Sequence, residues 1–376
     1  MATPPDLTKI PLAVNPSGAP PNFDNPPTLV DEARATGVAL IVLGGLCLAF
    51  RLGTNLKLSK TFCLDDYLCI FAFAGGIALW ILYQLNSEDG LARHMWDTPM
   101  STFTIAAMQR LTAILFVLAL TLWASKSAIL ALYIRIFGTI TWLRRTCWVW
   151  MVCMALFYSL NIVAAGAYCV PRTGEMWGGN SFSRCSSSAW LHVIVGGFSV
   201  AADLIILILP FPVVMRMRIS VAKKVTLGFV FGTGVILVVL SVVSLWLRVI
   251  IFKGQDSTWN ATLLQMVSIV EIFGTISVAC APAMSAFWLN IFTKTSLWTQ
   301  ITSSSVFSYL QSRMSPSRSH VDENPSFVSP PRVASSLQSP SAAGSEKGSR
   351  DIVKMTSYAV VDDENSLAPS VNHSRV

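Results

Sequence analysis

The hydrophobic positions of the chain are gathered into seven long stretches that short polar segments separate. Their approximate spans are 36–53, 65–85, 106–134, 146–168, 189–214, 226–250 and 261–288. About 20 consecutive apolar residues are enough for a helix to cross the hydrocarbon core of a bilayer. The pattern predicts an all-α, polytopic membrane protein with a seven-helix transmembrane bundle, whose two ends lie on opposite sides of the membrane.

The polar ends of the chain set the limits of this bundle. The first 30 residues are rich in Pro and Asn, and residues 291–376 are rich in Ser and Pro without a helical apolar period. Such compositions are typical of disordered segments. We therefore expect a disordered extracellular tail over 1–35, a transmembrane domain over 36–290 and a disordered cytoplasmic tail over 291–376.

Composition supports a membrane location and argues against other classes of protein. Only 12% of the residues are charged, whereas a soluble domain carries about 25%, and the mean hydropathy is +0.57. A net charge of +7 in a soluble domain would suggest nucleic-acid binding. Here the basic residues lie in alternate connections between the apolar stretches. We therefore expect the lipid bilayer as a partner and no nucleic acid.

These basic residues also predict an orientation, because cytoplasmic loops carry an excess of Lys and Arg. One side holds ten of them: Arg51, Lys57, Lys60, Arg135, Arg144, Arg145, Arg216, Arg218, Lys223 and Lys224. The opposite side holds four: Arg93, Arg172, Arg184 and Lys253. We expect the N-terminus outside, the C-terminus in the cytoplasm, and a multi-pass protein of the plasma membrane.

Two modifications are predicted on the outer side. Cys169 and Cys185 fall in the same outer connection, in a compartment that permits disulfides. We predict a bridge between them, and two free thiols are the alternative. Asn260-Ala-Thr262 is a glycosylation sequon on the same side, close to the membrane surface. Asn260 is therefore a candidate glycosylation site.

Four ionisable residues fall inside the apolar stretches, where charges are costly and usually paired or functional. They are Lys126, Asp203, Arg248 and Glu271. At about 1.5 Å of rise per residue, Lys126 lies roughly 13 Å and Asp203 roughly 20 Å from the cytoplasmic boundary. A lysine side chain reaches several ångströms, so Lys126 and Asp203 are close enough in depth to pair inside the bundle. Glu271 lies roughly 16 Å from the outer face, and Arg248 pairs with it only if the Arg248 side chain points inward.

This candidate buried polar network has two interpretations. The four charges either only hold helices together, or they line a polar cavity or act as a switch. A lone Lys–Asp pair does not distinguish the two, since polar groups at membrane depth equally form interhelical hydrogen bonds.

Catalytic and cofactor signatures are absent from the sequence. It contains no His-Glu-x-x-His, P-loop, Gly-x-Ser-x-Gly or Gly-x-Gly-x-x-Gly motif. No lysine occurs between residues 261 and 293, where a retinal Schiff base of the usual seven-helix type would need one. We expect no catalytic residue, no metal ligand and no cofactor, and hence a protein that is not an enzyme.

Several strings, in this order and spacing, resemble the family of fungal seven-helix membrane proteins with a rhodopsin-like domain. They are Asp65-Asp66-Tyr67, Gly90-Leu-Ala-Arg93-His94, residues 123–137 around Lys126, Cys169-Val-Pro171, Trp177, Cys185, Asp203, Pro210-x-Pro212, Lys223-Lys224, Arg248, Glu271 and Cys280-Ala-Pro282. The resemblance covers about 36–290. The chain departs from the family in Ala92, where glycine is frequent, and in lacking a basic residue soon after Pro282.

The resemblance implies fold and location more firmly than activity. That family includes receptor-like proteins of plant-pathogenic fungi, and some members occur in secondary-metabolite gene clusters. We therefore expect a receptor-like protein that senses a small molecule or a surface cue and signals to a cytoplasmic protein through its inner loops and tail. The alternative is a membrane transporter or an accessory membrane protein of a secondary-metabolite pathway. A purely structural membrane protein is a third interpretation.

Overall fold

The computed structural model describes residues 6–59, 62–177, 180–216 and 221–290. The expected cytoplasmic tail over 291–376 lies outside the described residues. So do several basic positions of the orientation argument, namely Lys60, Arg218 and the side chains of Arg216, Lys223 and Lys224.

Seven helices in the described part of the chain are long and apolar enough to cross a membrane, which confirms the predicted fold class. They are α1 (Val30–Thr54), α2 (Leu64–Asn86), α3 (Ile105–Phe137), α4 (Thr141–Cys169), α6 (Ala189–Ile208), α8 (Val221–Phe252) and α9 (Ser257–Asn290). Two short helices, α5 (Asn180–Ser187) and α7 (Phe211–Arg216), lie in the connections. Short π-helical and 3-10 turns follow α1 and α2: η1 (Asn55–Ser59), η2 (Ser87–Leu91), η3 (Met95–Asp97) and η4 (Met100–Thr102).

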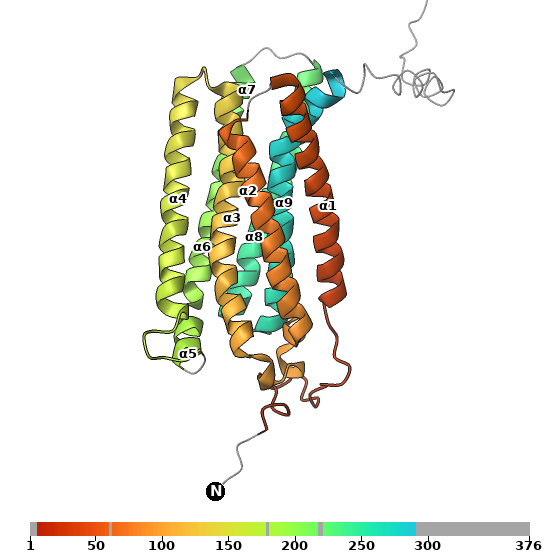
Figure 1. Ribbon diagram of the computed structural model, residues 1–376, viewed down its shortest axis with the longest axis vertical. Helices are drawn as coiled ribbons and strands as arrows, with labels where there is room; N and C mark the ends of the chain where they lie inside the picture. The colour runs from red at the N-terminus through yellow and green to blue at the C-terminus, as the bar shows by residue number, and fades with distance from the viewer. Residues whose placement is uncertain (1–5, 60–61, 178–179, 217–220, 291–376) are drawn as a thin grey trace, which may run out of the picture. The chain divides into compact units, whose positions relative to one another are not determined.

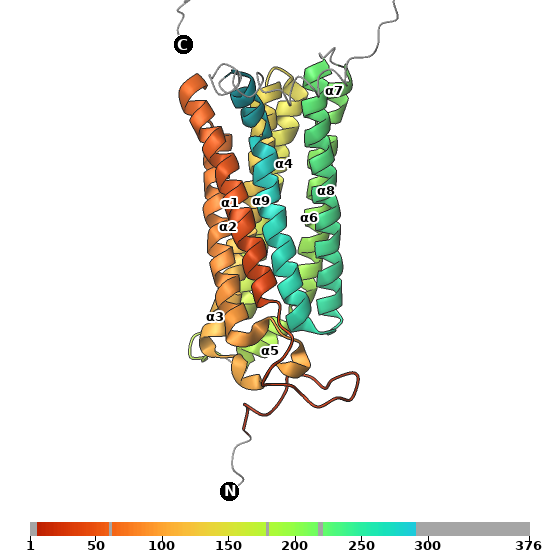
Figure 2. The same ribbon diagram turned by 90° about the vertical axis from the view of Figure 1, so that its right-hand side faces the viewer.

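The seven helices run side by side (Figures 1 and 2), and α3 is the most enclosed of the described spans. In its membrane-spanning window 61% of the residues are buried, more than in any other described span. It contacts α2, α4, α6 and α9. The core beside it contains fully buried Leu79, Leu130, Met154 and Ile272. A shift of α3 would therefore change its packing against several other helices at once.

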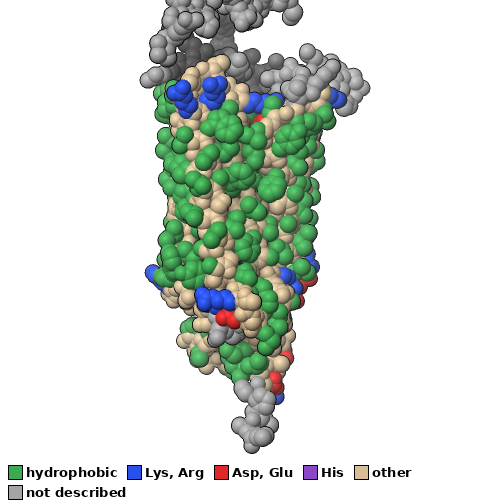
Figure 3. Space-filling view, turned by 60° about the vertical axis from the view of Figure 1, so that its left-hand side comes forward, with side chains coloured by type: hydrophobic (Ala, Val, Ile, Leu, Met, Phe, Trp, Pro, Cys, Tyr) green, Lys and Arg blue, Asp and Glu red, His purple; other side chains and the backbone are tan. Residues whose placement is uncertain are grey.

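The face of the bundle seen in Figure 3 is apolar along its length, with Lys and Arg near its two ends. On α4, for example, Val149, Leu156, Leu160 and Val163 are each 63–69% exposed and lie on one side of the helix. Such a surface would be unfavourable in water, but in a bilayer it contacts lipid tails while the helices satisfy their own backbone hydrogen bonds. The surface agrees with a membrane-spanning bundle.

Some of the paired glycines allow the close helix approach that their sequence suggests. A Cβ atom on Gly75 would clash with the Thr121 side chain of α3, and one on Gly76 would meet Phe273 of α9 at 3.0 Å. Gly196 of α6 faces the Arg248 side chain, where a Cβ atom would lie 2.7 Å from Cδ. By contrast, a Cβ atom on Gly197 or Gly232 would meet nothing within 4 Å.

The N-terminal segment differs from the expected disordered tail. Residues 6–29 make backbone hydrogen bonds with the α2–α3 connection: Leu12 N–H donates to Thr98 O at 3.0 Å, and Met100 N–H donates to Ile10 O at 2.9 Å. The Asn22 N–H also donates to the buried carboxylate of Asp97 at 2.9 Å. A Pro-rich composition does not reveal that this segment is ordered, because most of these hydrogen bonds are between backbone groups and do not depend on side-chain type.

Candidate functional site

Three groups of residues make up the candidate functional region, and α3 contributes to each. The first, called here the Lys126 cluster, comprises Lys126 on α3, Asp203 and Ser199 on α6, Ser241 on α8 and Glu271 on α9. Lys126 forms an ion pair with Asp203, and its Nζ atom lies 2.9 Å from Oε1 of Glu271. The predicted Lys126–Asp203 pair is therefore present, and Lys126 also takes Glu271 as a partner.

Hydroxyl groups complete the coordination of the two carboxylates. Ser241 Oγ donates to Asp203 Oδ2, and Ser199 Oγ donates to Glu271 Oε1 at 3.2 Å. A buried charge is tolerated only when it is paired and hydrogen-bonded, and removing one partner leaves an uncompensated charge. Four of the seven helices, α3, α6, α8 and α9, are thus joined by one cluster of mutually dependent interactions.

Arg248, the fourth member of the predicted network, stays outside this cluster. Its side chain is buried against Gly196, with 6% of the residue exposed. It forms no ion pair with a described residue, and its Nε atom has no hydrogen-bond partner among them. No Arg248–Glu271 ion pair is present among the described residues, and the partners of Glu271 there are Lys126 and Ser199, both at Oε1.

The Lys126 cluster is enclosed by protein. Lys126 and Ser127 are 0% exposed and Glu271 is 3% exposed. A cavity of about 40 Å³ reaches Asp203 between α3, α6, α8 and α9, with Tyr133 and Thr275 in its wall. It is large enough for water but not for a metabolite. The cluster therefore has the geometry of a junction between helices rather than of a ligand pocket.

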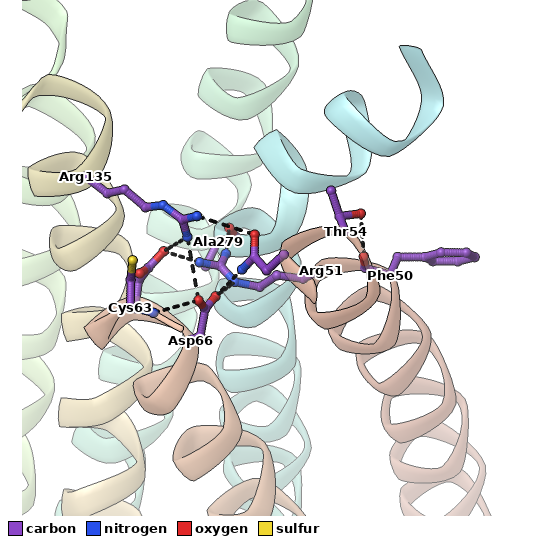
Figure 4. Close-up of polar contacts among 9 residues, drawn as sticks. Phe50, Arg51, Thr54, Cys63, Asp66, Arg135 and Ala279 are labelled. Atoms are coloured by element: carbon purple, nitrogen blue, oxygen red, sulfur yellow. Dashed lines mark hydrogen bonds and ion pairs between the residues drawn. The ribbon is translucent and has the colours of Figure 1, made fainter. Parts of the chain in front are cut away.

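The second group, called here the Arg51 cluster, lies near the start of α2 (Figure 4). It was not predicted from the sequence. Arg51 of α1 pairs with Asp65 and, from Nε to Oδ1 at 2.7 Å, with Asp66. It also donates to the backbone oxygen of Ala279 on α9. Arg135 at the end of α3 lies 3.2 Å from Asp65 Oδ2. These contacts join α1, α2, α3 and α9.

The local sequence explains why the two aspartates lie there. Both are in the first turn of α2, where free N–H groups and the helix dipole favour negative charge. Asp66 Oδ2 also accepts from the Cys63 N–H at 3.1 Å. Arg51, which the sequence suggested to be a loop cation, is instead 1% exposed within α1. The sequence signal for this cluster was the pair of adjacent aspartates at the start of an apolar stretch, because two buried carboxylates require a cation beside them.

The same acids raise the question of a metal site. One ligand atom each from Cys63, Asp65 and Asp66 lie within 4.8 Å of one another. Arg51 and Arg135 already pair with both carboxylates. A metal ion would have to displace these arginines, so the group fits an ion-pair junction better than a metal centre.

The third group surrounds a cavity beside the predicted disulfide, which is present between Cys169 and Cys185. We call it the disulfide cavity; its volume is about 290 Å³. Met108, Leu111 and Thr112 of α3 form one wall, and His192 of α6 forms another. The cavity lies at the end of the bundle that the charge pattern predicts to face outward.

An ion pair and several hydrogen bonds order the segment that carries the disulfide. Arg184 pairs with Glu175 at 3.2 Å and donates to the backbone oxygens of Tyr168 and Val170. The Arg172 N–H donates to Glu175 at 3.0 Å. That hydrogen bond, followed by those from Arg184, lowers the pKa of Glu175 below its ordinary value. The segment is thus cross-linked by a disulfide and by charge.

Two further connections meet at the same end. His94 in the α2–α3 connection pairs with Asp256 in the α8–α9 connection and stacks between Trp96 and Trp259, with ring centroids 4.6 and 4.1 Å away. The Met95 N–H also donates to Asp256 Oδ1 at 3.0 Å. These contacts hold two connections together beside the bundle.

Asn260, the candidate glycosylation site, lies in the first turn of α9. Its Nδ2 atom, where a glycan would attach, donates to the backbone oxygens of Gln255 and Asp256, each at 3.0 Å. A glycan would replace one of the two hydrogens on Nδ2, so at least one of these hydrogen bonds would have to break, and glycosylation stays a prediction.

Comparison with known proteins places the chain in a family. The model of the fungal rhodopsin domain matches residues 50–290, which is most of the helical bundle. The chain belongs to the fungal rhodopsin domain family. This confirms the resemblance drawn from residues 36–290, and with the seven apolar helices it establishes a multi-pass membrane protein.

Two known proteins are similar in sequence to this fungal rhodopsin domain protein. A SAT4 family membrane protein of Emericella nidulans is 25% identical over 177 residues, covering 46% of this chain and 44% of the relative. The match thus spans less than half of that relative. Fugralins biosynthesis cluster protein 2 of Gibberella zeae is 22% identical over 288 residues, covering 73% of this chain and 69% of the relative. No solved structure matches the chain.

Proposed function

We propose that the protein is a non-enzymatic, receptor-like membrane protein that senses an external cue and signals through its cytoplasmic loops and tail. The observation that supports this most is the position of α3. Its residues Met108 and Leu111 line the disulfide cavity, Lys126 centres the buried ionic cluster, and Arg135 pairs with Asp65. At about 1.5 Å per residue, these points span roughly 40 Å of one helix.

Such an arrangement suits a switch between two packings. Each cluster joins several helices through a few charge-assisted contacts in a low-dielectric interior, where half-broken arrangements are costly. A ligand that favours one position of α3 would shift the population of both clusters together. The bundle could thereby convert binding at one end into altered side-chain exposure at the other.

The proposed orientation puts the disulfide cavity outside and the Arg51 cluster at the cytoplasmic face, in the plasma membrane. The basic residues counted in the sequence support it. Epitope tags at the two termini, probed on intact and permeabilised cells, test it. A tag at residue 1 that is detected only after permeabilisation would contradict it.

Proximity labelling tests the signalling role. The full chain is fused at its C-terminus to a biotin ligase and expressed in a fungus lacking the gene, with and without extracts of host surfaces. Asp203→Asn removes the charge that pairs with Lys126 while keeping the shape. We expect this variant to change the set of labelled cytosolic proteins without any cue.

The control is Ser277→Ala, which removes a hydroxyl whose hydrogen bond among the described residues lies within α9, to Phe273 O. It should label the same proteins as the unaltered chain at equal abundance. If the unaltered chain and Asp203→Asn give identical label patterns under every cue, the receptor proposal fails.

A second candidate is an accessory membrane protein or transporter of a secondary-metabolite pathway. The name of the Gibberella zeae relative, which refers to a biosynthesis cluster, favours it. Gene deletion with measurement of metabolites inside and outside the cells distinguishes the two. Accumulation inside with loss outside indicates transport, whereas unchanged flux counts against it.

A further inference from the structure

The disulfide cavity has a volume of about 290 Å³. It is larger than the cavity beside Asp203, at about 40 Å³, and than a cavity between α1, α2 and α9, at about 20 Å³. Ligand pockets in proteins usually begin at roughly 300 Å³. The cavity therefore suits one small molecule. Its walls come from α3, α6, the end of α4 and the disulfide-bearing segment, so four parts of the chain would contact the occupant.

The cavity is held in shape before any ligand binds. The Cys169–Cys185 bridge ties the end of α4 to the segment before α6. Arg184 fastens the same segment to Glu175 and to the backbone of Tyr168. A pre-formed site loses less conformational freedom on binding, which favours affinity for a small ligand.

The chemistry of the wall narrows the class of ligand. Most lining residues are apolar, and no Asp, Glu, Lys or Arg is among the described residues that line it. Burying an ionised ligand against such a wall would cost far more than burying a neutral one. The occupant is therefore expected to be uncharged and mainly hydrocarbon.

The few polar groups in the wall are two hydroxyls, one imidazole and the indole N–H of Trp177, which is a donor only. Thr112 Oγ1 donates to Met108 O at 2.9 Å, and Ser186 Oγ donates to Ser183 O at 2.9 Å. Their protons are used, so both oxygens are left as acceptors. His192 offers a donor and an acceptor when neutral. A ligand that carries a hydroxyl proton matches these acceptors.

We propose that the disulfide cavity binds a small, neutral, mainly aliphatic alcohol. This proposal deepens the proposed receptor function by naming the chemical class of the cue. Binding itself does not depend on that function, whereas the signal that binding would cause rests on it. Such a ligand would contact α3 about two turns into the helix, on the same helix as Lys126. Binding would therefore bear on the position of the helix that centres the ionic cluster.

Photo-crosslinking of the purified full chain in nanodiscs tests the proposal. Three probes carry the same diazirine: an octanol, an octanoate and a phospholipid. We expect the octanol probe to label the peptide containing residues 108–115, and excess plain octanol to compete with it. The octanoate probe should label this peptide far less.

Two variants locate the site. Leu111→Trp fills the cavity and should abolish the competable label, whereas Leu120→Trp, on the lipid-exposed side of the same helix, should retain it. Thr112→Val removes an acceptor at nearly constant shape and should weaken competition by octanol. Each variant must show the Cys169–Cys185 bridge in a non-reducing digest and unfold at a temperature close to that of the unaltered chain.

Two results would overturn the proposal. One is labelling by the phospholipid probe that plain octanol does not reduce, because the cavity would then hold lipid tails. The other is equal labelling of Leu111→Trp and the unaltered chain. Binding is measured here without a signalling readout. If octanol binding is saturable but octanol does not change the cytosolic proteins found by proximity labelling, the receptor proposal is contradicted and the binding proposal is not.

Discussion

The Nζ atom of Lys126 lies 2.9 Å from Oε1 of Glu271, and neither side chain is more than 4% exposed. The same ammonium group pairs with Asp203, so one cation serves two buried carboxylates on different helices. The stability of the junction therefore depends more on Lys126 than on either acid.

Replacement of Lys126 by Met should destabilise the bundle strongly. Both carboxylates would lose their cation in a medium of low dielectric, and breaking a buried pair in this way costs about 3–5 kcal/mol. Thermal unfolding in detergent measures the effect. Lys57→Met at an exposed position is the matched control and should stay within about 0.5 kcal/mol.

Removing the Lys126–Asp203 pair as a unit should not restore stability. Lys126→Met with Asp203→Leu still leaves Glu271 charged and without its ammonium partner, so the double variant should unfold well below the unaltered chain. Adding Glu271→Gln removes the remaining charge and should recover much of the loss. Strict additivity of the three changes would contradict this coupling.

Arg51 and Arg135 should differ in their contributions to the Arg51 cluster. Arg51 is 1% exposed and pairs with two aspartates, so Arg51→Met should cost about 3–5 kcal/mol. The Arg135 side chain is 30% exposed, and Arg135→Met should cost about 1 kcal/mol or less. Unfolding midpoints of the two variants in one detergent compare them. Equal losses would mean that Arg51 is not the central cation.

Much of the fold and part of the site could be predicted from the sequence, because they depend on position along the chain. Length and hydropathy are enough to find seven spans. The rise of a helix is enough to put Lys126 and Asp203 at depths that a lysine side chain can bridge. The shared connection of Cys169 and Cys185 identified their bridge.

What the sequence did not reveal depends on rotation about helix axes and on backbone contacts. Depth alone cannot show that Glu271 faces Lys126 while Arg248 faces Gly196. Arg51 lies near the end of an apolar stretch, where a loop cation and a buried cation have the same pattern. The disulfide cavity involves side chains from four separate parts of the chain, and no single motif indicates it.

Loss of the disulfide should lower stability while leaving the helices intact. The bridge closes a loop with a sequence separation of 16 residues, and a loop of about this length contributes roughly 3 kcal/mol by chain entropy. Cys169→Ser with Cys185→Ser should lower the unfolding temperature under oxidising conditions. The control, Cys153→Ser, changes an exposed free cysteine on α4. An unchanged unfolding temperature in the double variant would show that the Arg184–Glu175 ion pair and its neighbouring hydrogen bonds hold the segment without the bridge.

The segment before α6 should also loosen in acid, because the pKa of Glu175 is lowered in the folded chain. A lowered pKa means that the carboxylate stabilises the segment above its unfolded pKa, and that this contribution is lost as pH falls through the folded pKa. Hydrogen exchange of residues 170–177 should therefore be constant near neutral pH, after correction for intrinsic rates, and rise in the acid range below the ordinary glutamate value. Glu175→Gln should show the faster exchange at every pH, whereas Glu32→Gln, at an exposed position on α1, should behave like the unaltered chain. Acid-induced exchange that persists unchanged in Glu175→Gln would assign the loosening to another group.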